Sequence, residues 1–257
     1  MKRNKRNMGF KMNEKLKNNE KIKLLQEIID KSERIVFFGG AGVSTESGIP
    51  DFRSKDGLYN MKYDYPPEQI LSRTFFKNNL KEFYRFYKDK MIVTGVKPNY
   101  CHEFLNKLEK KKKLLSIVTQ NIDGLHTEAG NTNVLELHGS VKRNYCMKCN
   151  RFYDEKYILE SKDIPKCQCR GIIKPDVVLY EENLNENIVY KAIRDISMAD
   201  CLIVGGTSLT VYPAAGMINY FNGKYLVLIN RDRTKYDNKA NLVINESIGE
   251  VFKNIKI

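Results

Sequence analysis

A glycine-rich segment that directly follows an apolar run is the part of this chain best suited to hold phosphate groups. Residues 35–38 read Ile-Val-Phe-Phe, and residues 39–54 continue as Gly-Gly-Ala-Gly-Val-Ser-Thr-Glu-Ser-Gly-Ile-Pro-Asp-Phe-Arg-Ser. Glycines at the end of a buried strand let backbone N–H groups approach a pyrophosphate, because no Cβ stands in the way. The usual dinucleotide fingerprint G-x-G-x-x-G is not met, since Thr45 occupies the position of its third glycine. Residues 51–53 then add a carboxylate, an aromatic face and a guanidinium, which indicates chemistry at a bound cofactor.

Four of the six cysteines form two close pairs that predict a metal site. They read Cys146-x-x-Cys149 and Cys167-x-Cys169, and residues 150–166 separate them. At this spacing two turns can converge on one tetrahedral Zn²⁺, and four thiolates without an open position make the site structural. Unligated thiols are the alternative. Such cysteine usage favours a reducing compartment, and we expect a cytoplasmic protein.

The elements that must position these residues alternate between apolar strands and amphipathic helices. Helical patterns are expected over about 14–32, 66–90, 98–112, 185–198, 213–221 and 247–255. Strands are expected over 35–38, 114–118, 134–137, 177–180, 201–204, 225–229 and 241–244. This alternation is typical of an α/β fold with a mostly parallel sheet and helices on both faces.

Polar residues follow several of these strands, where an open parallel sheet binds its ligands. The residues expected to face one crevice are Gly40 to Ser44, Gln120, Asn121, Asp123, His138, Thr207, Ser208 and Asn230. Taken alone, His138 is either a catalytic histidine or a hydrogen-bonded core residue. Cys101, Cys201, His102 and His126 are expected to be structural.

The formal charge of +13 is concentrated at the N-terminus. Residues 1–24 hold nine Lys or Arg against Glu14 and Glu20, which predicts a solvated basic leader over residues 1–20 that need not be ordered. The lysines at 110–113 are expected to end a helix and stay in water. No apolar stretch is long enough to span a membrane, so we expect no membrane association.

Five segments stand in the order found in one enzyme family. They are Gly40-Ala-Gly-Val-Ser-Thr-Glu-Ser-Gly-Ile-Pro-Asp-Phe-Arg-Ser54, Thr119-Gln-Asn-Ile-Asp-Gly-Leu-His126, Glu136-Leu-His-Gly139, Lys174-Pro-Asp-Val-Val178 and Gly206-Thr-Ser-Leu209 with Val211. With the cysteine module between the third and the fourth, they resemble the NAD-dependent protein deacylases called sirtuins over about residues 20–257. Gly39 and the C-x-C pair depart from the common pattern.

The resemblance implies a Rossmann-like NAD-binding domain over 21–142 and 173–257. It also implies an inserted zinc-binding module over 143–172, with the helical segment 50–95 forming the rest of a small domain. The activity implied is transfer of an acetyl, or a longer apolar acyl, group from lysine to ADP-ribose with release of nicotinamide. NAD⁺ would be the co-substrate and Zn²⁺ a structural ion.

The resemblance also assigns roles to individual residues. His138 would be the general base and Asn121 a second catalytic residue. The residues implied to bind the cofactor are Gly40, Ala41, Gly42, Thr45, Asp51, Phe52, Arg53, Gln120, Ile122, Asp123, His138, Gly206, Thr207, Ser208, Asn230 and Ile248. Val178 and Tyr180 would bind acyl-lysine protein substrates as an added strand along residues 177–180.

One comparison within the family narrows the range of acyl groups that we expect the enzyme to remove. Family members that prefer succinyl-lysine carry Tyr and Arg three residues apart on the helix at the acyl pocket, whereas this chain has Tyr84 and Tyr87. Without the arginine, an apolar acyl group is expected.

Other functions are weighed against this one. A mono-ADP-ribosyl transferase shares nicotinamide departure, and a zinc-ribbon nucleic-acid binder would use the positive charge, although nucleic acid is not the expected partner. A dehydrogenase is disfavoured by the missing third glycine. We expect a monomer.

Overall fold

The computed structural model describes residues 16–51 and 64–257, and a six-stranded sheet lies at its centre. Its strand order is β3-β2-β1-β7-β8-β9, and all neighbouring pairs are parallel. The strands are β1 (Ile35–Gly39), β2 (Leu114–Thr119), β3 (Val134–Glu136), β7 (Cys201–Gly205), β8 (Tyr225–Ile229) and β9 (Leu242–Ile244). The order reverses between β1 and β7, so the carboxyl ends of these two strands form the switch point of a Rossmann-like sheet.

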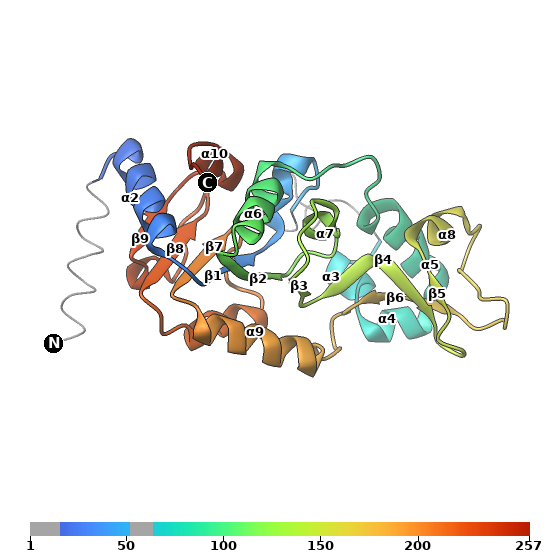
Figure 1. The fold of residues 1–257 in the computed structure, drawn as a ribbon. Helices are drawn as coiled ribbons and strands as arrows, with labels where there is room; N and C mark the ends of the chain where they lie inside the picture. The colour runs from blue at the N-terminus through green and yellow to red at the C-terminus, as the bar shows by residue number, and fades with distance from the viewer. Residues whose placement is uncertain (1–15, 52–63) are drawn as a thin grey trace.

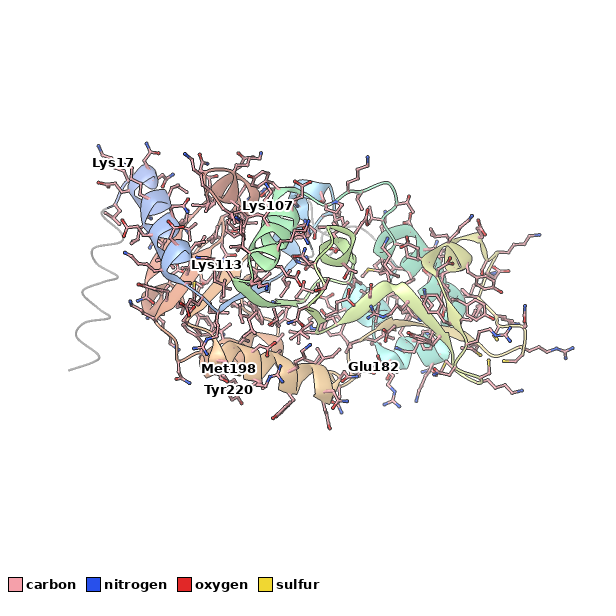
Figure 2. All side chains as sticks on the ribbon, in the orientation of Figure 1. Lys17, Lys107, Lys113, Glu182, Met198 and Tyr220 are labelled. Carbon is pink, nitrogen blue, oxygen red and sulfur yellow. The ribbon has the colours of Figure 1, made fainter. Side chains whose placement is uncertain are left out.

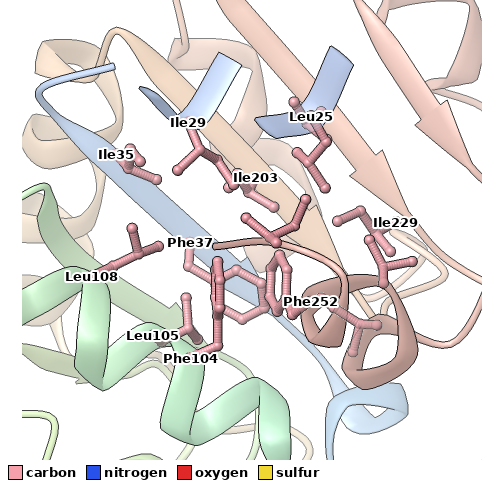
Figure 3. Packing of buried hydrophobic residues seen from close by; sticks show 14 of the residues in the cluster. Leu25, Ile29, Ile35, Phe37, Phe104, Leu105, Leu108, Ile203, Ile229 and Phe252 are labelled. Carbon is pink, nitrogen blue, oxygen red and sulfur yellow. The ribbon is translucent and has the colours of Figure 1, made fainter. Parts of the chain in front are cut away.

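Helices cover both faces of this sheet (Figure 1). On one face lie α2 (Asn18–Lys31), α6 (Tyr100–Lys110) and α10 (Ile248–Lys253), and on the other lie α9 (Glu186–Met198) and the 3₁₀ helix η5 (Ala214–Tyr220). Side chains of β1 alternate between the two cores: Phe37 packs with the first group and Phe38 with the second. Figure 3 shows the first core, where Phe104 of α6 stacks on Phe252 of α10 with ring centroids 4.1 Å apart.

A smaller lobe lies beside the β3 edge of the sheet (Figure 1). It contains an antiparallel sheet of order β5-β4-β6, formed by β4 (Gly139–Cys146), β5 (Phe152–Tyr153) and β6 (Ile173–Val177). Its helices are α3 (Pro67–Ile70), α4 (Arg73–Asn78), α5 (Leu80–Phe86), the π-helical turn η4 (Tyr87–Met91) and α8 (Glu155–Glu160). Aromatic side chains fill its core, including Phe76, Phe83, Tyr84 and Tyr87.

Four expectations about elements need correction. The strand expected over 177–180 is instead β6, which ends at Val177: Val178 makes the last hydrogen bond of the pairing by donating its N–H to the carbonyl of His138, just before β4, and Tyr180 then donates to that of Leu71. The helical stretch over 66–90 is four short elements, and the helix over 213–221 is 3₁₀. Lys113 does not stay in water: its Nζ donates to the carbonyls of Ile29 and Asp30 at the end of α2, each at 2.8 Å.

The remaining lysines of that run, Lys110 to Lys112, are exposed as expected. Figure 2 shows Lys17, Lys107 and Lys113 on the α2 and α6 side of the sheet, opposite Met198 and Tyr220. Cys101 and Cys201 are fully buried, as predicted. Within the described ranges, no helix has the length and apolar character that spanning a membrane requires.

Candidate functional site

A pocket of about 550 Å³ lies at the carboxyl ends of the parallel strands. Most of the residues predicted for the cofactor line it: Ala41, Gly42, Thr45, Asp51, Gln120, Asn121, Ile122, His138, Gly206, Thr207, Ser208, Asn230 and Ile248. Val178 and Tyr180 also line it. Gly40 and Asp123 are not among the lining residues, and Phe52 and Arg53 lie outside the described residues.

The loops after β1 and β7 touch backbone to backbone at the switch point. Gly42 donates its N–H to the Gly206 carbonyl at 2.8 Å, and a Cβ on Gly42 would lie 2.8 Å from the Gly206 Cα. Gly206 itself has a φ of +61°, and a Cβ there would lie 2.4 Å from the Val43 nitrogen. Glycine is therefore required on both sides of the contact. Gly40 packs against Thr207: a Cβ added at Gly40 would lie 2.7 Å from the Thr207 Cβ.

A chain of hydrogen bonds joins the loop after β1 to the segment after β2. Asn121 donates from Nδ2 to the Ser44 hydroxyl at 3.0 Å, and Ser44 donates to the Asp123 carboxylate at 2.7 Å. The other Asp123 oxygen accepts the Leu125 N–H, which holds the carboxylate at the start of α7 (Leu125–Glu128). Burial raises the pKa of Asp123, and the hydrogen bond from Ser44 opposes that rise. Asp123 therefore acts on the pocket through Asn121 and Ser44.

His138 stands in the two-residue link between β3 and β4, where the two sheets meet. Its Nδ1 lies 2.9 Å from the Gln120 carbonyl oxygen. A carbonyl can only accept, so Nδ1 carries the hydrogen and Nε2 is left as the basic nitrogen at the pocket. Burial lowers the pKa of His138, and the hydrogen bond to Gln120 opposes that change. The neutral, basic form is thus favoured near neutral pH.

The far end of the pocket lies between β7 and β8. Asn230 accepts the Thr207 N–H through Oδ1 at 2.8 Å, and Gln120 donates from Nε2 to the Thr207 hydroxyl at 3.1 Å. The Asn230 Nδ2 is buried and finds no hydrogen-bond acceptor within the described part of the chain. A donor of this kind, beside glycine loops that expose their backbone, suits the hydroxyl and phosphate oxygens of a dinucleotide.

One branch of the pocket is apolar and lies on the small-lobe side. Leu71, Met91, Ile122, Val177 and Leu179 line it. Arginine occurs among the described lining residues only at 231 and 233, after β8. This branch can take an apolar group, and its described lining residues offer no cation to a second carboxylate.

Tyr84 and Tyr87 lie behind this branch, outside the pocket lining. Both are buried in the small-lobe core, where the Tyr84 hydroxyl donates to the Ile173 carbonyl and Tyr87 stacks on Phe83. Neither position presents a cation to the pocket.

The four predicted zinc ligands converge. The Sγ atoms of these four cysteines all lie within 4.8 Å of one another, and the pairs Cys146–Cys169, Cys149–Cys167 and Cys149–Cys169 are 3.4–3.5 Å apart. Tetrahedral thiolate coordination at 2.3 Å needs sulfur separations of about 3.8 Å, so the cluster fits one Zn²⁺ after a small expansion. The shorter second pair is accommodated because Arg170, just after it, takes a left-handed turn with φ +65°.

His102 and His126 form a buried pair away from the pocket, with ring centroids 4.6 Å apart. Asn99 donates its N–H to the His102 Nδ1 at the start of α6, so this histidine has the structural role expected of it. Burial lowers the pKa of His102 to about 4 and that of His126 well below its usual value.

Several residues at or beside the pocket are missing from the sequence-based list of site residues. Ser44 follows the strand end as expected but lies beside the pocket, where it bonds Asn121 and Asp123. Leu71, Met91, Tyr212 and Arg231 carry no local signal, because the packing of other elements brings them to the pocket.

Comparison with known proteins agrees with this geometry. The model of the Sir2 family matches residues 40–213. An NAD-dependent protein deacetylase of Clostridium perfringens (strain 13 / Type A) is 63% identical over 90% of this chain and 97% of its own length. A Sir2 structure with a deacetylated p53 peptide and 3′-O-acetyl ADP ribose has a TM-score of 0.83 and 38% identity, covering 91% of this chain and 96% of its own. A Sir2–p53 peptide–NAD⁺ structure has a TM-score of 0.80 and 38% identity, covering 90% and 95%.

Proposed function

The chain belongs to the Sir2 family and is an NAD-dependent protein deacetylase, and we propose that its chemistry is carried by the groups at the strand ends around His138. In the reaction, the acyl oxygen of the substrate lysine attacks C1′ of the nicotinamide ribose, and nicotinamide leaves. A ribose hydroxyl then attacks the acyl carbon, the lysine amine departs, and one water adds to that carbon, which leaves the acyl group as an ester on ADP-ribose. The protein must hold two substrates in line, admit water only after nicotinamide has left, and move a proton from the ribose hydroxyl. The residues around the pocket divide these tasks.

His138 is the general base in this proposal. The bond from Nδ1 to the Gln120 carbonyl fixes the ring and its tautomer, and this is the observation that carries the assignment. Nε2 then takes the proton of the ribose hydroxyl that attacks the acyl carbon. Because burial lowers its pKa, the ring is neutral and ready to accept that proton at pH 7.

Asn121 orders the ribose hydroxyls and water at the reacting end. Its Nδ2 is directed by Ser44, which Asp123 orients in turn. The charge of Asp123 stabilises the electron-poor sugar carbon that develops as nicotinamide departs. Ile122, on the same loop, closes the apolar side of this subsite.

The remaining cofactor contacts are assigned to the phosphates, the adenosine ribose and adenine. The backbone of residues 40–42 and Gly206 binds the phosphates, together with Thr45, Thr207 and Ser208. Asn230 donates to the adenosine ribose, and Ile248 packs beside adenine. For Phe52 and Arg53 the proposal rests on the sequence alone: Phe52 would shield the reacting sugar, and Arg53 would bind phosphate.

Acyl-lysine substrates bind at the segment after β6. Val178 lines the pocket and is fixed there by donating its N–H to the His138 carbonyl, and we assign its carbonyl to the amide N–H of the acyl-lysine side chain. The substrate backbone then lies along Tyr180, and the acyl group enters the branch formed by Leu71 and Met91. The apolar lining supports acetyl or longer apolar groups as substrates.

The four thiolates hold a structural Zn²⁺ that ties β4 to the chain before β6. We propose further that the enzyme acts as a monomer in the cytoplasm. Six free cysteines, four of them suited to zinc, support a reducing compartment.

The substitution His138→Ala tests the central assignment. The purified variant should lose deacylation of an acetyl-lysine peptide while still binding ADP-ribose by calorimetry. Wild-type enzyme should yield 2′-O-acetyl-ADP-ribose, as read by mass spectrometry. Unchanged turnover by the variant would remove His138 from this role, and ADP-ribosylated protein without the acetylated product would favour ADP-ribosyl transfer.

A further inference from the structure

A single arginine outside the pocket bridges the two sheets beneath the active site. The Arg143 Nη1 lies 2.6 Å from Glu136 Oε2, and its Nε lies 2.8 Å from Asp176 Oδ2. Glu136 ends β3 of the parallel sheet, whereas Asp176 belongs to β6 of the antiparallel sheet. One guanidinium therefore connects β3 and β6, which belong to different sheets.

The two carboxylates that Arg143 contacts stand close in sequence to two residues of the candidate site. Glu136 is two residues before His138, and Asp176 is two residues before Val178. The proposed base and the proposed substrate carbonyl thus each follow directly on one arm of the bridge. They are also in contact, since Val178 donates its N–H to the His138 carbonyl at 3.0 Å.

An irregularity in β4 aims Arg143 at this point. Ser140 pairs with Asp176 and Asn144 pairs with Pro175, so four steps along β4 oppose one step along β6. Extra residues in one strand redirect side chains and are typical near active sites. Val141 enters the small-lobe core, Asn144 braces the bulge by donating to the Val141 carbonyl, and Arg143 turns to the carboxylates.

The backbone at the same place has little freedom. Gly139 has a φ of +75°, and a Cβ there would lie 1.9 Å from the Asp176 carbonyl oxygen. The Glu136 side chain is only 10% exposed, and burial raises the pKa of its carboxyl. Without Arg143, this buried carboxylate would lose its ion pair and would have to take up a proton or turn away.

We propose that Arg143 is a positioning residue for the deacylation reaction: through Glu136 and Asp176 it holds His138 and the Val178 carbonyl in register with each other. The inference rests on the proposed roles of His138 and Val178. We call the ion pairs of Arg143 with Glu136 and with Asp176 the two arms of the bridge, and they should affect different kinetic constants. The Glu136 arm fixes the base and governs kcat, whereas the Asp176 arm fixes the peptide segment and governs the peptide KM.

The experiment uses the full chain loaded with zinc and a short acetyl-lysine peptide with neutral flanking residues. Arg143→Met should lower kcat/KM for the peptide by about tenfold to a hundredfold, because small displacements of reacting groups cost this much, while the ADP-ribose affinity stays within twofold. Arg143→Lys, which retains the charge but not the forked geometry, should recover part of the loss. Arg85→Met is the matched control, since Arg85 also contacts two carboxylates, Glu82 and Asp64, on the exposed surface of the small lobe.

Single-arm variants keep the test decisive if Arg143→Met fails to fold. Asp176→Asn, at a half-exposed carboxylate, should raise the peptide KM with kcat little changed, and Glu136→Gln should lower kcat with the KM little changed. Equal effects of Arg143→Met and Arg85→Met, or a loss of ADP-ribose binding parallel to the loss of turnover, would overturn the proposal. If His138→Ala is inactive and these variants are not, the positioning role alone is wrong; if His138→Ala is active, the proposed function itself has failed.

Discussion

Ser44 donates a 2.7 Å hydrogen bond to Asp123, and this bond joins the loops that follow two neighbouring strands of the parallel sheet. The serine hydroxyl also accepts from Asn121, so one hydroxyl orients both a carboxylate and an amide at the reacting end of the pocket. Burial raises the pKa of Asp123, and the Ser44 bond opposes this rise. The bond from Ser44, in the loop after β1, therefore favours the ionised form of this carboxylate.

We predict that Ser44→Ala slows nicotinamide release. The change leaves the Asp123 oxygen and the Asn121 amide without their shared partner, so both groups are less well placed for the charge that develops as nicotinamide departs. We expect a transition-state loss of about 1–3 kcal/mol, which corresponds to a fall in kcat of roughly fivefold to a hundredfold. Nicotinamide release during turnover is the measurement. Ser197→Ala, which removes an exposed hydroxyl bonded to the Arg194 carbonyl, is the control and should leave the rate unchanged. An unaltered rate for Ser44→Ala would exclude the relay.

The pH dependence of kcat/KM should report on His138. Its pKa is lowered by burial, so the base is protonated only below the usual value of about 6.5 and activity should fall on the acid side of that value. Between pH 7 and 8 the rate should be level with respect to this group. A profile with its acid limb centred above 6.5 contradicts the assigned environment of the ring.

Stability should also decrease in mild acid because of the His102 and His126 pair. Both have depressed pKa values in the folded state, so below about 6.5 the unfolded chain binds protons that the folded chain does not. The stability contributed by the neutral pair is present above the unfolded pKa. It is lost as the pH falls, and for His102 the loss continues to the folded value of about 4.

Urea unfolding at pH 7.5 and pH 5 measures this loss. His126→Phe replaces the buried ring by one of similar shape that cannot be protonated, so it should reduce the difference in unfolding free energy between the two pH values. Its deacetylase activity at pH 7.5 should be retained, because the pair lies away from the pocket. An unchanged difference would mean that other groups cause the acid sensitivity.

Removal of zinc should destabilise the small lobe before it affects the parallel sheet. The thiolates connect β4 to the chain before β6, and structural zinc sites supply folding free energy directly. Cys149→Ser should contain much less than one equivalent of zinc by elemental analysis and should lose peptide turnover. ADP-ribose binding should persist, because the residues proposed to bind it follow β1, β7 and β8. Loss of ADP-ribose binding together with peptide turnover would indicate that the two lobes unfold as one unit.

The sequence predicted the strand-end part of the site well. Gly42, His138, Thr207 and Asn230 follow apolar runs, and parallel strands bring such residues to one edge whatever the details of packing. Residues whose place depends on the small lobe could not be found in this way. Arg143 reaches its carboxylates because of an irregularity in β4, and no local pattern signals it.

Dependence on packing between elements also explains why the strand expected over 177–180 was wrong: β6 covers Ile173–Val177. Residues 177–180 are apolar enough for a buried strand, but the length of the run does not reveal which sheet it joins or where pairing stops. Pairing with β4 begins at Ile173, and its last hydrogen bond runs from the Val178 N–H to the carbonyl of His138, just before β4 begins; Tyr180 then donates its N–H to the Leu71 carbonyl. Tertiary hydrogen bonds therefore decided the boundary.

Acyl selectivity follows from the apolar branch beside Leu71 and Met91. An acetyl or butyryl group adds only an apolar tail there, whereas a succinyl group would bury a carboxylate beside lining residues that, between 64 and 257, include no lysine or arginine on this side. An unpaired buried charge costs several kcal/mol, so turnover of a succinyl-lysine peptide should be at least about a hundredfold below that of the acetyl-lysine peptide. Leu71→Ala should widen the branch and raise kcat/KM for a longer apolar acyl group relative to acetyl, without rescuing succinyl. Competition assays with matched peptides measure both ratios, and preferential turnover of the succinyl peptide by the wild-type enzyme would contradict the assignment of this branch to the acyl group.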